Sequence, residues 1–386
     1  QEQGFMIDKA ALVSFGEGLT GTIAELERAI YEHAGCEFNI NSPKQLGEVL
    51  FDKLLLPAGK KTKTGWSTNA DVLEKLRGKH PIVNMILDYR MLTKLKSTYA
   101  DGLLKLIDPD GRIRTKFQMT VTATGRLSST DPNLQNIPIR KELGSHIREM
   151  FIASKGNVLV DADYSQIELR LLAHISGDEH MRAAFLSGED IHTVTASQVF
   201  NTPIDEVTPL QRSRAKAVNF GIVYGISPWS LAQDIGVTQG EAKAYMDAYL
   251  NKYDGVRDYM KSIVEKAKQD GYVTTIYSRR RDLPELKSSN FNTRSFGERV
   301  ALNMPIQGTA ADIIKLAMVN VYNRLKAEGL KARLILQVHD ELICECPENE
   351  AQTVADILRE EMSGAAKLSV PLTVDAKIGH SWAEAH

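Results

Sequence analysis

Two apolar segments that carry acidic residues constrain the fold of this chain more than any other feature of its sequence. Residues 157–164 (NVLVDADY) have the apolar run of a buried β-strand and end in acid. Residues 333–345 (RLILQVHDELICE) contain two apolar runs around His339, Asp340 and Glu341, which predicts a β-hairpin with acids at its tip. A carboxylate at the end of a buried strand is costly unless it is paired or binds a cation, so both segments need a partner.

Each acidic segment also has a simpler interpretation when it is taken alone. Asp163 can cap the helix predicted after it, and the acids at the hairpin tip can be solvated turn residues. The apolar residues on both sides of the tip favour a rigid sheet instead of a loose loop. On neighbouring strands, two carboxylate sites can hold two Mg²⁺ ions about 4 Å apart, the arrangement that supports in-line phosphoryl transfer. The sequence therefore predicts a two-metal site, in which Mn²⁺ can replace Mg²⁺.

A helical stripe of two cations and two aromatic rings lies between the acidic segments in the sequence. In residues 212–225 (RSRAKAVNFGIVYG), Arg212, Lys216, Phe220 and Tyr224 recur every four residues and so share one helix face. A nucleoside triphosphate has the same layout, with phosphates at one end and a flat base at the other. An amphipathic helix whose basic side chains reach out to solvent is the alternative for the stripe alone.

Most of the remaining chain has the apolar spacing of helices. A strand is predicted over residues 112–121, after a turn at 108–111. Helical insertions between strands that carry acids favour an α+β fold. The helices are predicted over residues 19–33, 43–55, 70–76 and 82–104, over most of 168–270, and over 297–327 with an interruption near Pro305.

The bulk properties are those of a cytoplasmic protein with two or three subdomains. The 386 residues contain no apolar run of the ~18 residues that a membrane span needs, and no signal-peptide layout. Three cysteines form no disulfide framework, and Cys344 and Cys346 are predicted to pack on one strand face. A net charge of −2 argues mildly against a nucleic-acid partner, but clusters of basic residues leave the question open.

The three segments resemble the signature motifs of family A DNA polymerases, the bacterial DNA polymerase I type. Residues 160–170 (VDADYSQIELR) are similar to the family's DYSQIELR motif, 212–225 to its Arg-Lys-Phe-Tyr-Gly helix, and 337–341 to its VHDE turn. Further similarity runs from 122–128 (TATGRLS) to the C-terminal region, and it is weaker in the first hundred residues.

The resemblance implies a right-hand polymerase fold with an antiparallel-sheet palm, helical fingers and a helical thumb. The chain would be a Klenow-like fragment that lacks both an exonuclease and a 5′-nuclease domain, since its 386 residues leave no room for them. The thumb is expected mainly in residues 1–108 with a basic tip near 59–69, the palm in 109–168 and 293–386, and the fingers in 169–292.

The resemblance also implies roles at the reaction centre. Asp163 and Asp340 match the metal-binding aspartates, Glu341 an auxiliary acid, and the Tyr164 carbonyl would complete the metal shell. Lys216 would also donate a proton to the leaving pyrophosphate. Residues that would bind the incoming deoxynucleotide are Arg212, Lys216 and His192 at the phosphates, Phe220 at the sugar and base, Tyr224 at the template position, Glu168 as a steric gate against a ribose 2′-hydroxyl, and Gln166 and Arg140 nearby.

A further set implied by the resemblance contacts primer–template DNA, where donors in the minor groove can check pair geometry without reading sequence. The resemblance further implies a monomer that uses deoxynucleoside triphosphates in DNA replication and repair. The DNA contacts would be Arg126, Arg299, Asn303, Gln307, Gln337 and His339, with Lys60, Lys61 and Lys63 as phosphate contacts at the thumb tip.

Two departures from the family pattern occur around an arginine run at 279–281. The family commonly has Gly before this run and an aromatic residue after it, where this chain has Ser278 and Asp282. An acid beside Arg281 is expected to weaken a template contact. Among rival functions, a nuclease has no use for the triphosphate stripe, an RNA polymerase should not carry the Glu168 gate, and a silent DNA clamp would have lost one of the metal-binding aspartates.

Overall fold

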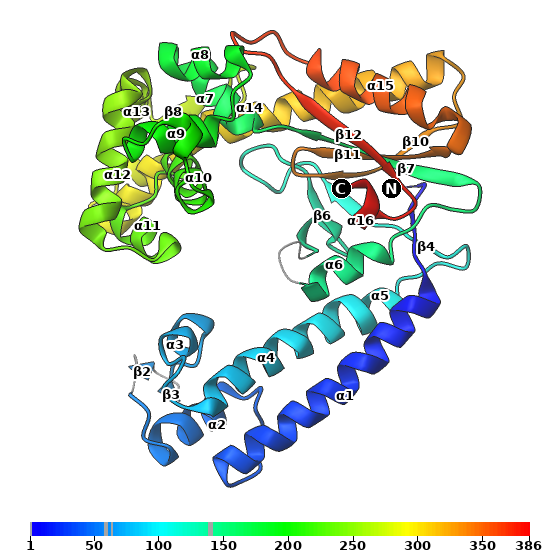
Figure 1. Cartoon of the computed structure of the whole chain (residues 1–386), viewed down its shortest axis with the longest axis vertical. Coiled ribbons are helices and arrows are strands. Elements are labelled where there is room, and N and C mark those ends of the chain that lie inside the picture. Colours follow the sequence, from blue (N-terminus) through cyan, green and yellow to red (C-terminus); the bar gives the residue numbers. More distant parts are fainter. Residues whose placement is uncertain (1, 58–60, 63–64, 138–141) are drawn as a thin grey trace. The chain divides into compact units, whose positions relative to one another are not determined.

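The computed structural model describes residues 2–57, 61–62, 65–137 and 142–386, and the chain divides into two compact units (Figure 1). The helical unit contains residues 4–114 and 137–152. The sheet unit contains residues 1–3, 115–136 and 153–386. The expected division of the latter into palm and fingers stays a prediction. Among the described residues, no helix is both long and apolar enough to span a membrane.

A four-stranded antiparallel sheet forms the base of the sheet unit. Asp163 on the third strand of the order lies opposite Glu341 on one neighbour and Asp375 on the other. The predicted strand over 157–164 and the predicted hairpin are both confirmed. The strand order is β10 (Arg333–Val338), β11 (Glu341–Pro347), β7 (Asn157–Tyr164) and β12 (Val374–Gly379).

Strand β7 has one apolar and one acidic face because successive side chains of a strand point to opposite sides. Val158, Val160, Ala162 and Tyr164 belong to the main hydrophobic core. Helix α15 (Ala351–Ser363) packs on this side, and α16 (Trp382–Ala385) lies on the other (Figure 1). Cys344 and Cys346 are buried in the same core, as predicted.

Seven α-helices lie between β7 and β8 in the chain, in agreement with the predicted helical stretch. The helix that carries the cation and aromatic stripe is α10, which begins with a capping box between Thr208 and Gln211 and ends at Gly225 in the left-handed region (φ 64°). The helices are α7 (Ile167–Ser176), α8 (Glu179–Ser187), α9 (Ile191–Val199), α10 (Pro209–Tyr224), α11 (Pro228–Ile235), α12 (Gln239–Lys252) and α13 (Asp254–Asp270).

Helix α14 (Phe291–Ala327) continues for 37 residues and passes through Pro305. The predicted interruption near Pro305 is therefore wrong. A proline removes one backbone N–H from a helix, but here the surrounding residues Met304 and Ile306 are buried and hold the helix in place. The hydroxyl of Thr309 also donates to the Pro305 carbonyl at 2.5 Å. A short hairpin of β8 (Tyr272–Thr274) and β9 (Arg280–Asp282) precedes this helix.

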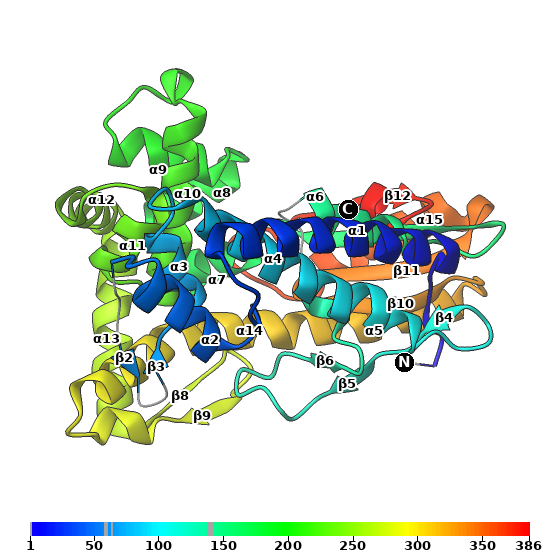
Figure 2. The same ribbon diagram turned by 90° about the horizontal axis from the view of Figure 1, so that it is seen from below.

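The helical unit is built on two long helices, α1 (Lys9–Ala34) and α4 (Pro81–Leu95), which lie side by side in Figure 2. Asp8 caps the first of them by accepting from the Ala11 amide at 2.9 Å. The predicted strand over 112–121 is split, because β4 (Arg112–Ile113) pairs with β1 (Phe5–Met6) whereas β5 (Lys116–Gln118) pairs with β6 (Ser128–Thr130) in the sheet unit. The helices here are α1 (Lys9–Ala34), α2 (Pro43–Gly47), a π-helix (Glu48–Lys53), α3 (Ala70–Lys75), α4 (Pro81–Leu95), a second π-helix (Lys96–Ala100), α5 (Asp101–Leu104) and α6 (Glu142–Glu149).

Candidate functional site

The sheet brings Asp163 and Asp340 together at one end of strand β7. Asp163 is the penultimate residue of β7, and Asp340 lies in the two-residue turn between β10 and β11. The Tyr164 amide donates to the Asp340 carbonyl at 3.2 Å, which ties the end of β7 to this turn. His339 precedes Asp340 with a positive φ of 48°, as the residues of tight hairpin turns commonly have.

The two aspartates lie in an environment that disfavours two bare negative charges. The pKa of Asp163 is raised by burial and by the neighbouring carboxylates of Asp340, Glu341 and Asp375. Burial also raises the pKa of Asp340, to about 6. Asp163 Oδ1 is buried and has no hydrogen-bond partner among the described residues. Two carboxylates and a backbone carbonyl are hard oxygen donors, so this arrangement fits Mg²⁺ or Mn²⁺.

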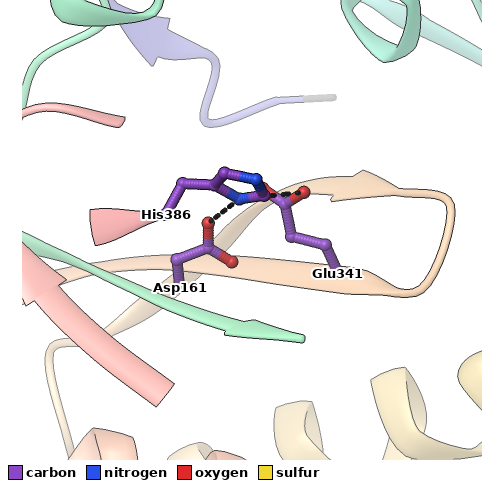
Figure 3. A group of neighbouring side chains, drawn as sticks. All are labelled: Asp161, Glu341 and His386. Carbon is purple, nitrogen blue, oxygen red and sulfur yellow. Dashed lines mark ion pairs between the residues drawn. The ribbon is translucent and has the colours of Figure 1, made fainter. Parts of the chain in front are cut away.

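Glu341 belongs to a second group on the same face of the sheet (Figure 3). Trp382 donates its indole N–H to Glu341 Oε1 at 2.7 Å. His386 Nδ1 lies 3.5 Å from Asp161 Oδ2 and 3.7 Å from Glu341 Oε2. The potential ligand atoms of Asp161, Glu341 and His386 all lie within 4.8 Å of one another. A hollow of about 480 Å³ adjoins both groups and is lined by Asp161, Asp163, Arg359, Asp375, Ala376, Lys377, Ala385 and His386.

Glu168 stands in the first turn of α7 and is fixed by two donors. Arg126 Nη2 lies 2.6 Å from Glu168 Oε1, and Tyr224 donates its hydroxyl to Glu168 Oε2 at 2.8 Å. Glu168 is 6% exposed. Gln166 is the residue before the helix and adopts a left-handed backbone (φ 56°), which turns the chain sharply from β7 into α7.

The predicted stripe on α10 lies on the side of that helix that faces solvent. Arg212, Lys216 and Tyr224 are exposed and Phe220 is half-buried, in agreement with one shared face. Arg212 binds Asp190 through two hydrogen bonds of 2.7 and 3.0 Å. Burial opposes ionisation of Asp190, but the hydrogen bonds from Arg212 and from Thr193 outweigh it and lower its pKa to about 2.

His192 is almost fully buried beside the stripe, 5.8 Å from the ring of Phe220. Its Nδ1 lies 3.0 Å from Nδ2 of Asn219, which is buried on the inner face of α10. Asn219 also shares hydrogen bonds with Thr195, which in turn contacts the hydroxyl of Tyr253 at 3.3 Å. Burial lowers the pKa of His192 to about 4, so the imidazole is neutral near pH 7.

Sequence analysis missed Asn219, although a signal was present. An amide in the middle of α10, between the apolar residues Val218 and Ile222, is a polar group that needs a buried partner. Gln135 was also missed. It donates through Nε2 to Gln337 Oε1 at 3.1 Å and to the Gln337 carbonyl at 3.2 Å.

The residues expected to contact DNA are distributed over several elements. Arg299, Asn303 and Gln307 follow one face of α14, where Arg299 is exposed and the other two are half-buried. Gln337 is buried and donates to the His339 carbonyl at 2.7 Å. A small hollow brings some of these side chains together and is lined by Arg126, Leu127, Gln135, Ile314, Lys315, Gln337 and His339.

The basic tip lies only partly within the described residues. Lys61 is exposed in the helical unit, with its Nζ 4.8 Å from the centre of the Trp66 ring. Lys60, Lys63 and Arg140 lie outside the described residues, so their expected roles stay predictions.

The arginine run at 279–281 has an acidic partner within its own hairpin. Asp282 pairs with Arg280 at 2.7 Å, and Arg280 also covers the ring of Tyr272 at 3.8 Å. The acid at 282 thus engages Arg280, and its expected effect on a template contact of Arg281 stays a prediction. Ser278 occupies a left-handed backbone (φ 63°), a conformation that favours glycine, the residue that the family resemblance implies at this position.

Comparisons with known proteins agree with the motifs. Residues 9–384 match the model of "DNA polymerase family A". The chain is 56% identical to DNA polymerase I of Bacillus subtilis (strain 168) over 387 residues, which cover 100% of this chain and 44% of that protein. It is 52% identical to DNA polymerase I of Caldicellulosiruptor bescii, covering 100% of this chain and 45% of the relative. The chain therefore spans less than half the length of these relatives.

A solved structure is similar along nearly the whole chain. The POL domain of Pol1 from M. smegmatis, in complex with DNA primer-template and dNTP, is 48% identical with a TM-score of 0.94. The match covers 99% of this chain and 68% of that chain. The expected α+β polymerase fold is thereby confirmed.

Proposed function

Because the chain belongs to DNA polymerase family A and is its polymerase domain, we propose that it adds deoxynucleotides to a primer 3′-hydroxyl on a DNA template by two-metal-ion nucleotidyl transfer. The observation that carries the proposal is the pair Asp163 and Asp340, which a hydrogen-bonded strand end and turn hold together. The M. smegmatis POL domain was solved with primer-template and dNTP, which supports the same partners here.

The two aspartates and the Tyr164 carbonyl would hold Mg²⁺. The bound ions would lower the pKa of the primer hydroxyl and offset the charge of the triphosphate and of the leaving pyrophosphate. The raised pKa of Asp163 and its buried oxygen without a hydrogen-bond partner among the described residues support this role. Both features describe a site that a bound cation would stabilise.

The exposed face of α10 would bind the triphosphate. Arg212 and Lys216 supply positive charge, and Phe220 offers a ring against the sugar and base. The primer 3′-hydroxyl would lose its proton to solvent as its oxygen forms a bond to the α-phosphorus and the bond from that phosphorus to the bridging oxygen breaks. The bonding electrons leave with pyrophosphate, and Lys216 would donate a proton to this leaving group. Asp190 holds Arg212 at 2.7 Å and so keeps the guanidinium oriented before the nucleotide binds.

His192 would add a neutral donor to the phosphates. Its Nδ1 accepts from Asn219, which leaves the ring proton on Nε2. A donor without net charge can then hydrogen-bond a phosphate oxygen.

Selection of deoxynucleotides would depend on Glu168. Two donors, Arg126 and Tyr224, fix this carboxylate, so it cannot turn aside to admit a 2′-hydroxyl without losing a hydrogen bond. A rigid obstacle discriminates better than a mobile one, because a mobile side chain yields to the larger substrate.

Contacts to primer–template DNA would come from polar side chains of the sheet unit and from Lys61 of the helical unit. Arg299, Asn303 and Gln307 on α14 present donors to the minor-groove acceptors that all base pairs offer. Lys61 would add salt-dependent affinity for phosphates.

A primer-extension assay tests the proposed function. The purified chain is given a labelled primer–template, Mg²⁺ and either dNTPs or NTPs, with Asp340→Ala as the inactive control. Extension with dNTPs that requires Asp340 supports the proposal. Degradation of the primer in place of extension would indicate a nuclease, and equal use of NTPs would indicate an RNA polymerase.

A further inference from the structure

The acidic face of the sheet carries more carboxylates than the proposed two-metal site uses. Asp161 and Asp163 lie on β7, Glu341 lies opposite Asp163 on β11, and Asp375 lies opposite Asp163 on β12. Directly opposite residues of antiparallel strands have Cβ atoms about 4.5–5.5 Å apart, and like charges there repel each other. Glu341 is therefore close enough to compete for the same cations unless something else binds its carboxylate.

The C-terminal segment supplies the groups that bind it. Trp382 is fully buried, and its indole N–H reaches Glu341 Oε1 at 2.7 Å. Hydrogen bonds to an ionised acceptor are stronger than neutral ones, and a buried indole has little freedom to move away. His386 Nδ1 lies between the two carboxylates, 3.7 Å from Glu341 and 3.5 Å from Asp161 (Figure 3).

These contacts place the Glu341 carboxylate beside Asp161. An oxygen of Glu341 and an oxygen of Asp161 lie within 4.8 Å of each other. Lys377 faces the same region, because it lies opposite Asp161 on β12 and contacts the His386 carbonyl. The indole N–H of Trp382 thus binds Glu341 and His386 lies within ion-pair distance of Asp161, whereas Asp163 Oδ1 has no hydrogen-bond partner among the described residues.

We propose that Trp382 is a positioning residue, whose indole N–H holds the Glu341 carboxylate beside Asp161 and so leaves Asp163 and Asp340 as the cation ligands. The inference rests on the proposed two-metal function. Trp382 acts through Glu341 and touches neither substrate nor metal. Loss of the N–H frees Glu341 to turn toward Asp163, which changes the affinity of the site for Mg²⁺ and the geometry of the ions.

The test replaces Trp382 with phenylalanine, which keeps an aromatic ring in the core and removes the N–H. Single-turnover extension is measured over a range of Mg²⁺ concentrations, together with kcat, KM for dNTP and the Kd for primer–template. We expect the Mg²⁺ concentration for half-maximal rate to change roughly tenfold and kcat to fall by a similar factor, as the loss of a hydrogen bond to a charged group would produce. The Kd for primer–template should stay unchanged.

Trp66→Phe is the matched control, because Trp66 also donates its indole N–H to a carboxylate, that of Asp52, at 3.0 Å in the helical unit. This control should leave the Mg²⁺ dependence unchanged. A second arm repeats Trp382→Phe in a Glu341→Ala background. If Trp382 acts through Glu341, Trp382→Phe has no further effect on the Mg²⁺ dependence or on kcat in the Glu341→Ala background. Additive effects of the two substitutions would overturn the inference.

The outcomes separate the two proposals. A wild-type chain that does not extend primers contradicts the proposed function. A wild-type chain that extends primers, with an unchanged Mg²⁺ dependence in Trp382→Phe, contradicts the positioning role alone. If the phenylalanine variant fails to fold, a benzothienylalanine at position 382 keeps the shape of the indole and replaces N–H by sulfur, and the same measurements then decide.

Discussion

The hydroxyl of Tyr224 donates a 2.8 Å hydrogen bond to the carboxylate of Glu168. Tyr224 is the last residue of α10, and Glu168 lies in the first turn of α7. The bond therefore joins the end of the cation and aromatic stripe to the predicted sugar gate. Arg126 binds the other carboxylate oxygen at 2.6 Å. The gate is consequently one part of a three-residue network.

Removing the Glu168 side chain should weaken discrimination against ribonucleotides. For Glu168→Ala we expect the ratio of kcat/KM for dNTP to that for NTP to fall roughly tenfold or more, since a steric barrier of about 1–3 kcal/mol disappears. Glu168→Gln is the matched control, because it keeps the size and loses the charge. Discrimination retained in Gln and lost in Ala supports a steric gate, and equal loss in both variants contradicts it.

Loss of Asp340 should abolish extension without loss of DNA binding. Asp340→Ala removes one of the two carboxylates of the proposed metal site, whereas the predicted minor-groove contacts on α14 remain. We expect a rate reduction of at least about a thousandfold in single-turnover extension and a Kd for primer–template within about threefold of wild type. Asp375→Asn, on the exposed neighbouring strand position, serves as the control that should still extend. Retained extension in Asp340→Ala would overturn the metal assignment.

The metal-free chain should become more stable when Asp163 is made neutral. The pKa of Asp163 is raised in the folded state. Its carboxyl group therefore does not destabilise the folded state below the unfolded-state pKa near 4, and it destabilises that state increasingly as pH rises toward the folded-state pKa. In EDTA, Asp163→Asn should therefore be more stable than wild type at pH 8 by about 1–3 kcal/mol, and equal to it at pH 4. Urea unfolding at both pH values checks this. Equal stability at pH 8 would contradict the raised pKa.

Acidification should destabilise the chain in part through His192. Its folded pKa is lowered to about 4, so its contribution to stability is present above the unfolded value near 6.5 and is lost as pH falls toward 4. The loss is about 1.4 kcal/mol per unit of pKa difference. Denaturant unfolding of His192→Gln should show a flatter pH dependence between 6.5 and 4. The exposed His180→Gln should follow wild type, and a slope equal to wild type in His192→Gln would refute the explanation.

A glycine at position 278 should stabilise the chain. Ser278 has a φ of 63°, a conformation that costs an ordinary residue roughly 1 kcal/mol and glycine little. Ser278→Gly should therefore raise the free energy of unfolding by up to about 1 kcal/mol, as measured by urea denaturation. Ser288→Gly is the control, because Ser288 has an ordinary φ of −68° and should gain nothing from glycine. A destabilised Ser278→Gly would contradict the assigned strain.

The sequence predicted the acidic strands well because their signal is local. The apolar run of 157–164 and the polar break at 339–341 each specify a strand or a turn within a few residues, and the structure has both. The four-residue spacing on α10 likewise predicted the exposed face on which Arg212 and Tyr224 lie.

What the sequence could not predict depends on contacts between distant segments. A hydrogen bond joins Trp382 of α16 to Glu341 of β11, and the sequence around either residue does not indicate the other. Gln135 reaches Gln337 in the same way. The local rule that a proline interrupts a helix fails at Pro305, because burial of the surrounding helix outweighs the loss of one backbone hydrogen bond.

The predicted metal ligands and the side chains predicted to select the nucleotide belong to different kinds of element. Asp163 and Asp340 are fixed by a strand end and a tight turn, whereas Glu168, Arg212 and Tyr224 stand on helices α7 and α10. For protein engineering this separates two tasks. Under the proposed function, libraries confined to the two helices would change which nucleotide is accepted, while the carboxylates on the strand end and turn would preserve the reaction itself.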